Sequence, residues 1–120
     1  MNTIRRVAVV GSRKFTNYAQ VCKVLDETLE RDDTIVSGGA LGVDSMAQRY
    51  SKEKGFNLMI FYPRYSLGPG AAFIRNRTIV DNSDLVLAFY SKDAYQSGGT
   101  ANTAMYARKL GVELKEFEEE

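Results

Sequence analysis

The chain has no histidine and a single cysteine among its 120 residues. The lack of histidine excludes catalysis by an imidazole and any ordinary histidine-containing metal site. Cys22 alone cannot form an internal disulfide, and its place beside Val21, Val24 and Leu25 predicts a small core residue rather than a nucleophile. The sequence therefore predicts no metal site and no cofactor.

Excess charge and long apolar runs are also missing. Lys and Arg number 16 against 15 for Asp and Glu, so the net charge of +1 gives no general attraction to nucleic acid or anionic membranes. No apolar stretch is long enough to span a bilayer, and residues 1–6 lack the apolar core of a secretory signal. We expect a cytoplasmic protein without a membrane partner, in which any contact with a polyanion is a local patch.

Hydrophobic residues make up 44% of the chain, which is enough for one core. They lie in segments that alternate between the pattern of a strand and the pattern of a helix. β-Branched runs predict strands at residues 4–10, 34–37, 57–62, 85–90 and 112–117. Apolar residues at helical spacing predict helices at 18–30, 43–54, 71–81 and 101–110. Both prolines fall in an expected loop at 63–70. The chain is thus predicted to form one domain over residues 1–117, followed by a solvated, frayed acidic tail at 118–120.

Strands that alternate with helices predict an α/β fold, a Rossmann-like three-layer sandwich with a mainly parallel five-stranded sheet and helices on both faces. In such sheets, ligands bind beyond the carboxyl ends of the strands, where the winding direction reverses. For the strand order 3-2-1-4-5 this point lies between the first and fourth strands. The loops after strands one, two and four are therefore expected to form one site.

Two glycine turns, Ser37 to Asp44 (SGGALGVD) and Ser97 to Thr100 (SGGT), each lie between a predicted strand and a predicted helix. A helix that begins directly after a strand exposes free N–H groups and the positive end of its dipole, and glycine lets an anion approach the backbone. Both turns are therefore predicted to bind phosphate, although glycine there is also expected simply because the turns are tight.

Four motifs in order resemble the Rossmann core of the SLOG superfamily: VVGSR at 9–13, SGGALGVD at 37–44, FIRNRTI at 73–79 and SGGTANTA at 97–104. The nearest branches resemble the core of the DNA-processing protein DprA/Smf and the small stand-alone YspA-like proteins carried by bacteria and phages. The more distant Lonely Guy (LOG) branch hydrolyses nucleoside monophosphates. The resemblance implies binding of a nucleotide or a nucleotide-derived molecule.

Two departures from these relatives bear on activity. LOG-type enzymes carry a glutamate shortly after the second glycine turn, where this chain has Asn102 and Thr103, and an amide cannot replace a carboxylate at a glycosidic bond. DprA-like proteins bind single-stranded DNA and carry flanking domains, for which we expect no room in 120 residues.

The residues predicted to bind the ligand or its phosphate are Gly11, Ser12, Arg13, Gly38, Gly39, Asp44, Arg75, Asn76, Ser97, Gly98, Gly99 and Thr100. Asp44 has two readings, a cap of the second helix or a hydrogen-bond acceptor for a ribose hydroxyl or a base. Residues two apart in a helix point about 200° away from each other. Arg75 is therefore expected at the pocket, with Arg77 on the surface or paired with Asp81.

Three functions follow from these residues. The first is a sensor or sequestering protein that binds a nucleotide-derived small molecule. The second is a nucleotide N-glycosidase in which Asp44 and Arg75 are the catalytic candidates. The third is a single-stranded DNA binder, in which a dimer aligns two copies of Arg13, Arg75 and Arg77. A homo-oligomer is expected in each case, because a small domain gains from shared burial.

Overall fold

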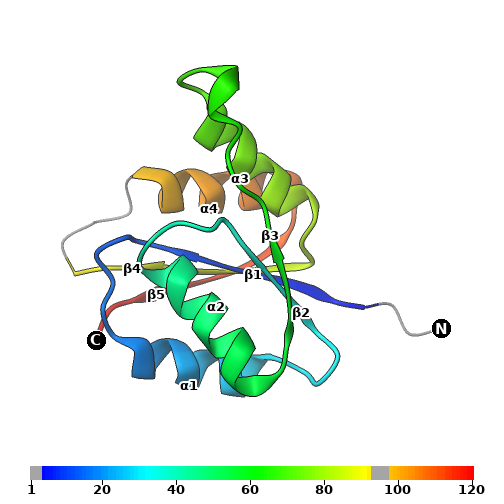
Figure 1. Ribbon diagram of the computed structural model, residues 1–120, viewed down its shortest axis with the longest axis vertical. Coiled ribbons are helices and arrows are strands. Elements are labelled where there is room, and N and C mark those ends of the chain that lie inside the picture. The colour runs from blue at the N-terminus through cyan, green and yellow to red at the C-terminus, as the bar shows by residue number, and fades with distance from the viewer. Residues whose placement is uncertain (1–3, 93–97) are drawn as a thin grey trace.

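The computed structural model describes residues 4–92 and 98–120 as one parallel sheet of order β3-β2-β1-β4-β5, covered by helices on both faces (Figure 1). Every adjacent pair of strands is parallel. The elements are β1 (Arg6–Gly11), α1 (Tyr18–Thr28), β2 (Thr34–Ser37), α2 (Val43–Lys54), β3 (Asn57–Ile60), the 3-10 helix η1 (Tyr65–Leu67), α3 (Ala71–Asp81), β4 (Leu85–Tyr90), α4 (Gly98–Leu110) and β5 (Glu113–Glu118). The predicted Rossmann-like α/β fold is confirmed.

Two apolar clusters hold the layers together, one on each face of the sheet. Val7 and Val9 of β1 point toward α1 and α2, where they join Leu25 and Tyr50. The alternate residues of β1 point to the opposite face, toward α3 and α4, in a cluster with Ile79, Val80 and Ala107. Because side chains alternate across a strand, the continuous apolar run in β1 serves both faces of the sheet.

The predicted bounds of β2, α2, α3 and β4 coincide with the structure, and the others differ at one or both ends. Helix α1 stops at Thr28, because Leu29 has extended backbone angles. Helix α2 ends as expected at Gly55, which adopts the left-handed conformation. The largest difference concerns α4, which begins at Gly98 and so includes the glycines expected to precede it.

The acidic tail is exposed at Glu118 and Glu120, as expected, but the expectation that it is frayed is wrong. Glu118 is the last residue of β5, and the backbone N–H of Glu119 donates to Tyr90 O at 2.8 Å. Gln20 of α1 donates to Glu118 O at 2.8 Å and accepts from Glu120 N at 3.0 Å. The charge of the tail predicts solvation, but it does not reveal that Tyr90 of β4 and Gln20 of α1 form hydrogen bonds with the tail backbone.

The strand order places the carboxyl ends of β1 and β4 side by side, since Gly11 pairs with Phe89. Helices α1 and α2 cover one face of this junction and α3 and α4 the other (Figure 1). The reversal of winding therefore lies between β1 and β4, as the sequence predicts. In the described part of the chain, no helix is both long enough and apolar enough to cross a membrane.

Candidate functional site

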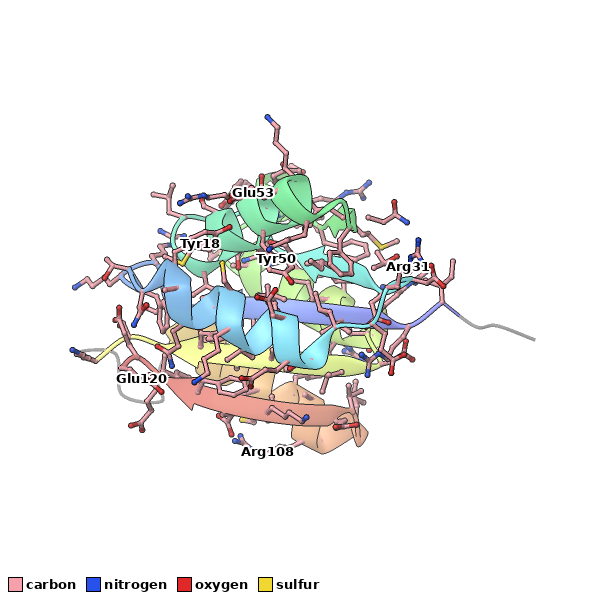
Figure 2. The ribbon with its side chains drawn as sticks, turned by 90° about the horizontal axis from the view of Figure 1, so that it is seen from below. Tyr18, Arg31, Tyr50, Glu53, Arg108 and Glu120 are labelled. Atoms are coloured by element: carbon pink, nitrogen blue, oxygen red, sulfur yellow. The ribbon has the colours of Figure 1, made fainter. Side chains whose placement is uncertain are left out.

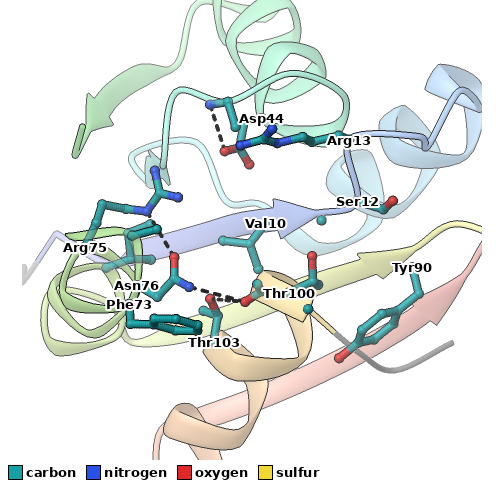
Figure 3. A pocket seen from close by; sticks show the side chains of 16 residues that line it. Val10, Ser12, Arg13, Asp44, Phe73, Arg75, Asn76, Tyr90, Thr100 and Thr103 are labelled. Atoms are coloured by element: carbon teal, nitrogen blue, oxygen red, sulfur yellow. Dashed lines mark hydrogen bonds between the residues drawn. The ribbon is translucent and has the colours of Figure 1, made fainter. Parts of the chain in front are cut away.

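A cavity of about 630 Å³ opens at the carboxyl ends of β1 and β4 (Figure 3). Its walls come from the ends of β1 and β4, from the segments after β1 and β2, from α3 and from the first turns of α4. The lining residues are Val10, Gly11, Ser12, Arg13, Ala40, Asp44, Ala72, Phe73, Arg75, Asn76, Ile79, Tyr90, Gly98, Gly99, Thr100 and Thr103. Segments nearly 100 residues apart thus meet in one hollow of the size that small-molecule sites have.

Close backbone packing explains two of the glycines on the β1 side. A Cβ on Gly11 would lie 2.6 Å from Phe89 O and 2.7 Å from the Cβ of Val43. Gly42 has φ +74°, and a Cβ there would lie 2.7 Å from Arg13 Cα. These glycines let α2 begin against the β1–α1 loop, which fixes the backbone from which Arg13 extends.

On the opposite wall, the first turn of α4 consists of Gly98, Gly99 and Thr100. N–H groups in a first helical turn have no partner within the helix, and the helix dipole is positive there. Gly98 needs glycine because its φ is +78°, but Gly99 is different. A Cβ on Gly99 would meet a single described atom within 4 Å, Asn76 Nδ2 at 3.9 Å. Packing among the described residues therefore gives no reason for the missing side chain at Gly99.

Arg75 and Asn76 connect the two glycine turns through hydrogen bonds, of which Figure 3 draws those from Arg75 to Asn76 and from Asn76 to Gly99. Arg75 Nη1 donates to Gly38 O at 2.5 Å, and Arg75 Nε donates to Asn76 Oδ1 at 3.0 Å. Asn76, only 5% exposed, donates from Nδ2 to Gly99 O at 3.3 Å and to Asn102 Oδ1 at 3.2 Å. These contacts hold the Arg75 guanidinium at the cavity wall and give both the oxygen and the nitrogen of the buried Asn76 amide a hydrogen-bond partner.

Asp44 is a buried carboxyl in this wall, 6% exposed. Its Oδ2 accepts from Ala40 N at 3.0 Å, so it ties the β2–α2 loop to the first turn of α2. Burial raises the pKa of Asp44, and the Ala40 N–H and the charges of Arg75 and Arg13 oppose that rise without cancelling it. Among the described lining residues, the cavity thus has two cationic side chains and one carboxyl with a raised pKa.

Most of the predicted binding residues line this cavity, namely Gly11, Ser12, Arg13, Asp44, Arg75, Asn76, Gly98, Gly99 and Thr100. Gly38 and Gly39 do not line it. A Cβ on Gly38 would lie 2.6 Å from Arg75 Nη1, and one on Gly39 would lie 2.5 Å from Tyr62 Cε1. Both glycines make room for a side chain. Ser97 lies outside the described residues.

The two arginines of α3 separate as the helical geometry predicts. Arg75 lines the cavity, whereas the Arg77 guanidinium lies 5.2 Å from the centre of the Tyr106 ring instead of pairing with Asp81. Arg77 therefore does not line the cavity with Arg13 and Arg75.

Sequence reasoning missed several lining residues, above all Phe73, Tyr90 and Thr103. Tyr90 is the last residue of β4, and its position at a strand's carboxyl end was a usable signal. Phe73 is 57% exposed although it faces the cavity, which is unusual for a large apolar side chain. The Thr103 hydroxyl donates to Gly99 O at 3.0 Å and supports the first turn of α4.

The fold and the site together define a Rossmann-like domain with a ligand-sized cavity at its topological switch point. The chain belongs to the YAcAr family, the YspA, cpYpsA-related SLOG family, whose sequence model matches residues 5–68. The predicted SLOG resemblance is thereby confirmed.

Among solved structures, the X-ray structure of DNA processing protein A (DprA) from Streptococcus pneumoniae is similar to this chain, with a TM-score of 0.57 and 20% identity. The match covers 93% of this chain and 58% of the DprA chain, and at this identity it shows the shared fold alone. The comparison with curated proteins gives no match.

Proposed function

We propose that the protein binds a nucleotide or a nucleotide-derived small molecule and acts as a sensor or sequestering protein. The phosphate is held by the N–H groups of Gly98, Gly99 and Thr100, and Arg75 and Arg13 supply positive charge. The remaining volume, walled in part by Phe73, accommodates the base and sugar. Membership of a SLOG family supports this class of ligand.

The observation that carries the proposal is the space beside Gly99. Glycine loses more conformational freedom on folding than alanine does, so its presence at position 99 without strain or a close described neighbour calls for another explanation. Close approach of a ligand to the backbone supplies one, since a methyl group there would stand in the path of an anion.

Isothermal titration with nucleoside monophosphates, ADP-ribose, NAD and cyclic nucleotides tests the proposal, with wild type and Gly99→Ala compared side by side. We expect Gly99→Ala to fold with equal or greater stability and to lose at least about tenfold in affinity. Arg75→Gln should also weaken binding, whereas Arg77→Gln, two residues away and outside the cavity, is the matched control. No binding of any compound by wild type, or unchanged affinity in Gly99→Ala, contradicts the proposal.

The burial of Asp44 favours a second candidate, hydrolysis of a nucleotide at its N-glycosidic bond. A buried carboxyl with a raised pKa is a candidate acid or base, and Asp44 lines the same cavity as Arg75. Asn102 and Thr103, at the place of the LOG glutamate, are engaged with Asn76 and Gly99 instead. Chromatography after incubation with each monophosphate should detect free base from wild type and none from Asp44→Asn, which should still bind.

A further inference from the structure

We propose that Glu119 is a positioning residue for the cavity, because it fastens the β1–α1 loop to the end of β4. This inference rests on the proposed function, since it concerns the wall that carries Arg13. Glu119 itself does not line the cavity. It acts through the two segments that it joins.

One half of the connection is made by backbone. The N–H of Glu119 donates to Tyr90 O at 2.8 Å, which carries the pairing of β4 and β5 beyond their last paired residues. Tyr90 is 2% exposed and lines the cavity. Glu119 is therefore held against a rigid strand at the edge of the site.

The other half is made by the carboxylate. Oε2 accepts from Thr16 N and Thr16 Oγ1, both at 3.0 Å, and from Asn17 N at 3.1 Å. Burial of the Glu119 carboxyl works against ionisation, but the hydrogen bonds from Thr16 and Asn17 outweigh it and lower the pKa. A carboxylate is also favoured at this position by the dipole of α1, whose N-cap is Asn17. The contacts of Gln20 with the chain on both sides of Glu119 hold it in register.

The loop between these attachments is the one that carries Arg13. At its start, Ser12 N donates to Phe89 O at 3.0 Å, and Ser12 Oγ lies 3.0 Å from Ser91 Oγ. At its end, Thr16 is held by Glu119. Residues 13–15 are thus anchored to the β4 side of the sheet at both ends, which limits the positions that the Arg13 guanidinium reaches.

The same contact places a carboxylate at the N-terminus of α1. In dinucleotide-binding Rossmann domains the pyrophosphate lies at the N-terminus of the first helix. Here the Glu119 carboxylate lies against that terminus, and Figure 2 shows the neighbouring Glu120 at the end of the sheet where α1 begins. The first turn of α4 lies in the cavity wall, together with Asp44 of α2 and Ala72 and Phe73 of α3.

Glu119→Ala and Glu119→Gln test the inference, with Glu118→Ala, the exposed neighbour, as the control. Amide hydrogen exchange of the ligand-free protein should rise at least about tenfold at residues 13–17 in Glu119→Ala, while exchange in β2 and α2 stays unchanged. Glu119→Gln should recover most of the protection, because an amide oxygen accepts the same bonds. Unchanged exchange at residues 13–17 overturns the inference.

Titration with AMP and with ADP-ribose provides the second readout, at a temperature where every variant is folded. We expect Glu119→Ala to bind about tenfold more weakly and Glu119→Gln to bind nearly as wild type does. Equal affinities in wild type and Glu119→Ala also overturn the inference. If wild type binds neither compound nor any other nucleotide, the proposed function fails, and the exchange measurement still decides whether Glu119 holds the loop.

Discussion

Replacing Gly38 with alanine should displace Arg75 from the cavity while the fold persists. The new Cβ would lie 2.6 Å from Arg75 Nη1, 2.9 Å from Arg75 Cζ and 3.0 Å from Asp44 Oδ2. Contacts this short force a movement. The crowded atoms are mostly the far end of a flexible side chain, so the guanidinium rather than the backbone should give way.

The expected loss of stability is small because two effects oppose each other. The hydrogen bond from Arg75 to Gly38 O involves a charged donor, and such bonds contribute about 1.5–3 kcal/mol. Arg75 is only partly buried, so water replaces part of that contribution. Alanine also lowers the entropy of the unfolded chain, a gain of about 0.4–1 kcal/mol. We expect a net loss of about 1 kcal/mol, seen as a fall in Tm of about 4 °C.

The effect on binding should be larger. A guanidinium that loses its position no longer donates to the bound anion, which at about 1.5–3 kcal/mol corresponds to a ten- to hundredfold rise in Kd. Thermal unfolding and isothermal titration with the tightest nucleotide measure the two quantities on the same samples.

Gly70→Ala is the matched control for this substitution. Gly70 has φ −83°, and a Cβ on it would have no described atom within 4 Å. By the entropy argument applied to Gly38, we expect it to raise Tm by no more than about 4 °C and to leave the affinity unchanged. A Gly38→Ala protein that binds as tightly as wild type would show that the placement of Arg75 does not matter for the ligand.

Three further outcomes are expected. Because burial raises the pKa of Asp44, the charged carboxylate disfavours the folded state above that pKa. Asp44→Asn should therefore raise Tm at about pH 7.5, and this gain should shrink as the pH falls through the folded-state pKa. A constant difference in Tm between about pH 7.5 and pH 4 contradicts this expectation. Gly42→Ala should lower the free energy of unfolding in urea by at least about 3 kcal/mol, because strain at φ +74° adds to a clash with the backbone of Ser12 and Arg13. Gly55→Ala, with φ +78° and no close neighbour, is the control and should cost about 1 kcal/mol. Equal losses in the two variants would show that the clash at Gly42 contributes nothing. Light scattering should find a homo-oligomer, and a monomer at high concentration rejects this expectation.

The sequence by itself determined the elements, their order and the edge of the sheet where the site lies. The apolar run of β1 and the helical spacing in α2 and α3 are local patterns, and local patterns are readable one residue after another. Parallel crossovers then leave few ways to arrange five strands, so the strand order and the switch point followed. The motif residues at the carboxyl ends came together for the same reason.

Only the tertiary structure decided what each of those residues does. Gly38 makes room for Arg75, 37 positions away, and Glu119 holds Thr16 across 103 positions. The glycine turn at 97–100 likewise did not show in the sequence that α4 begins at Gly98, or that open space lies beside Gly99 at the cavity wall. Such roles depend on which distant atoms approach one another, and packing fixes those approaches rather than any preference written in the neighbouring residues.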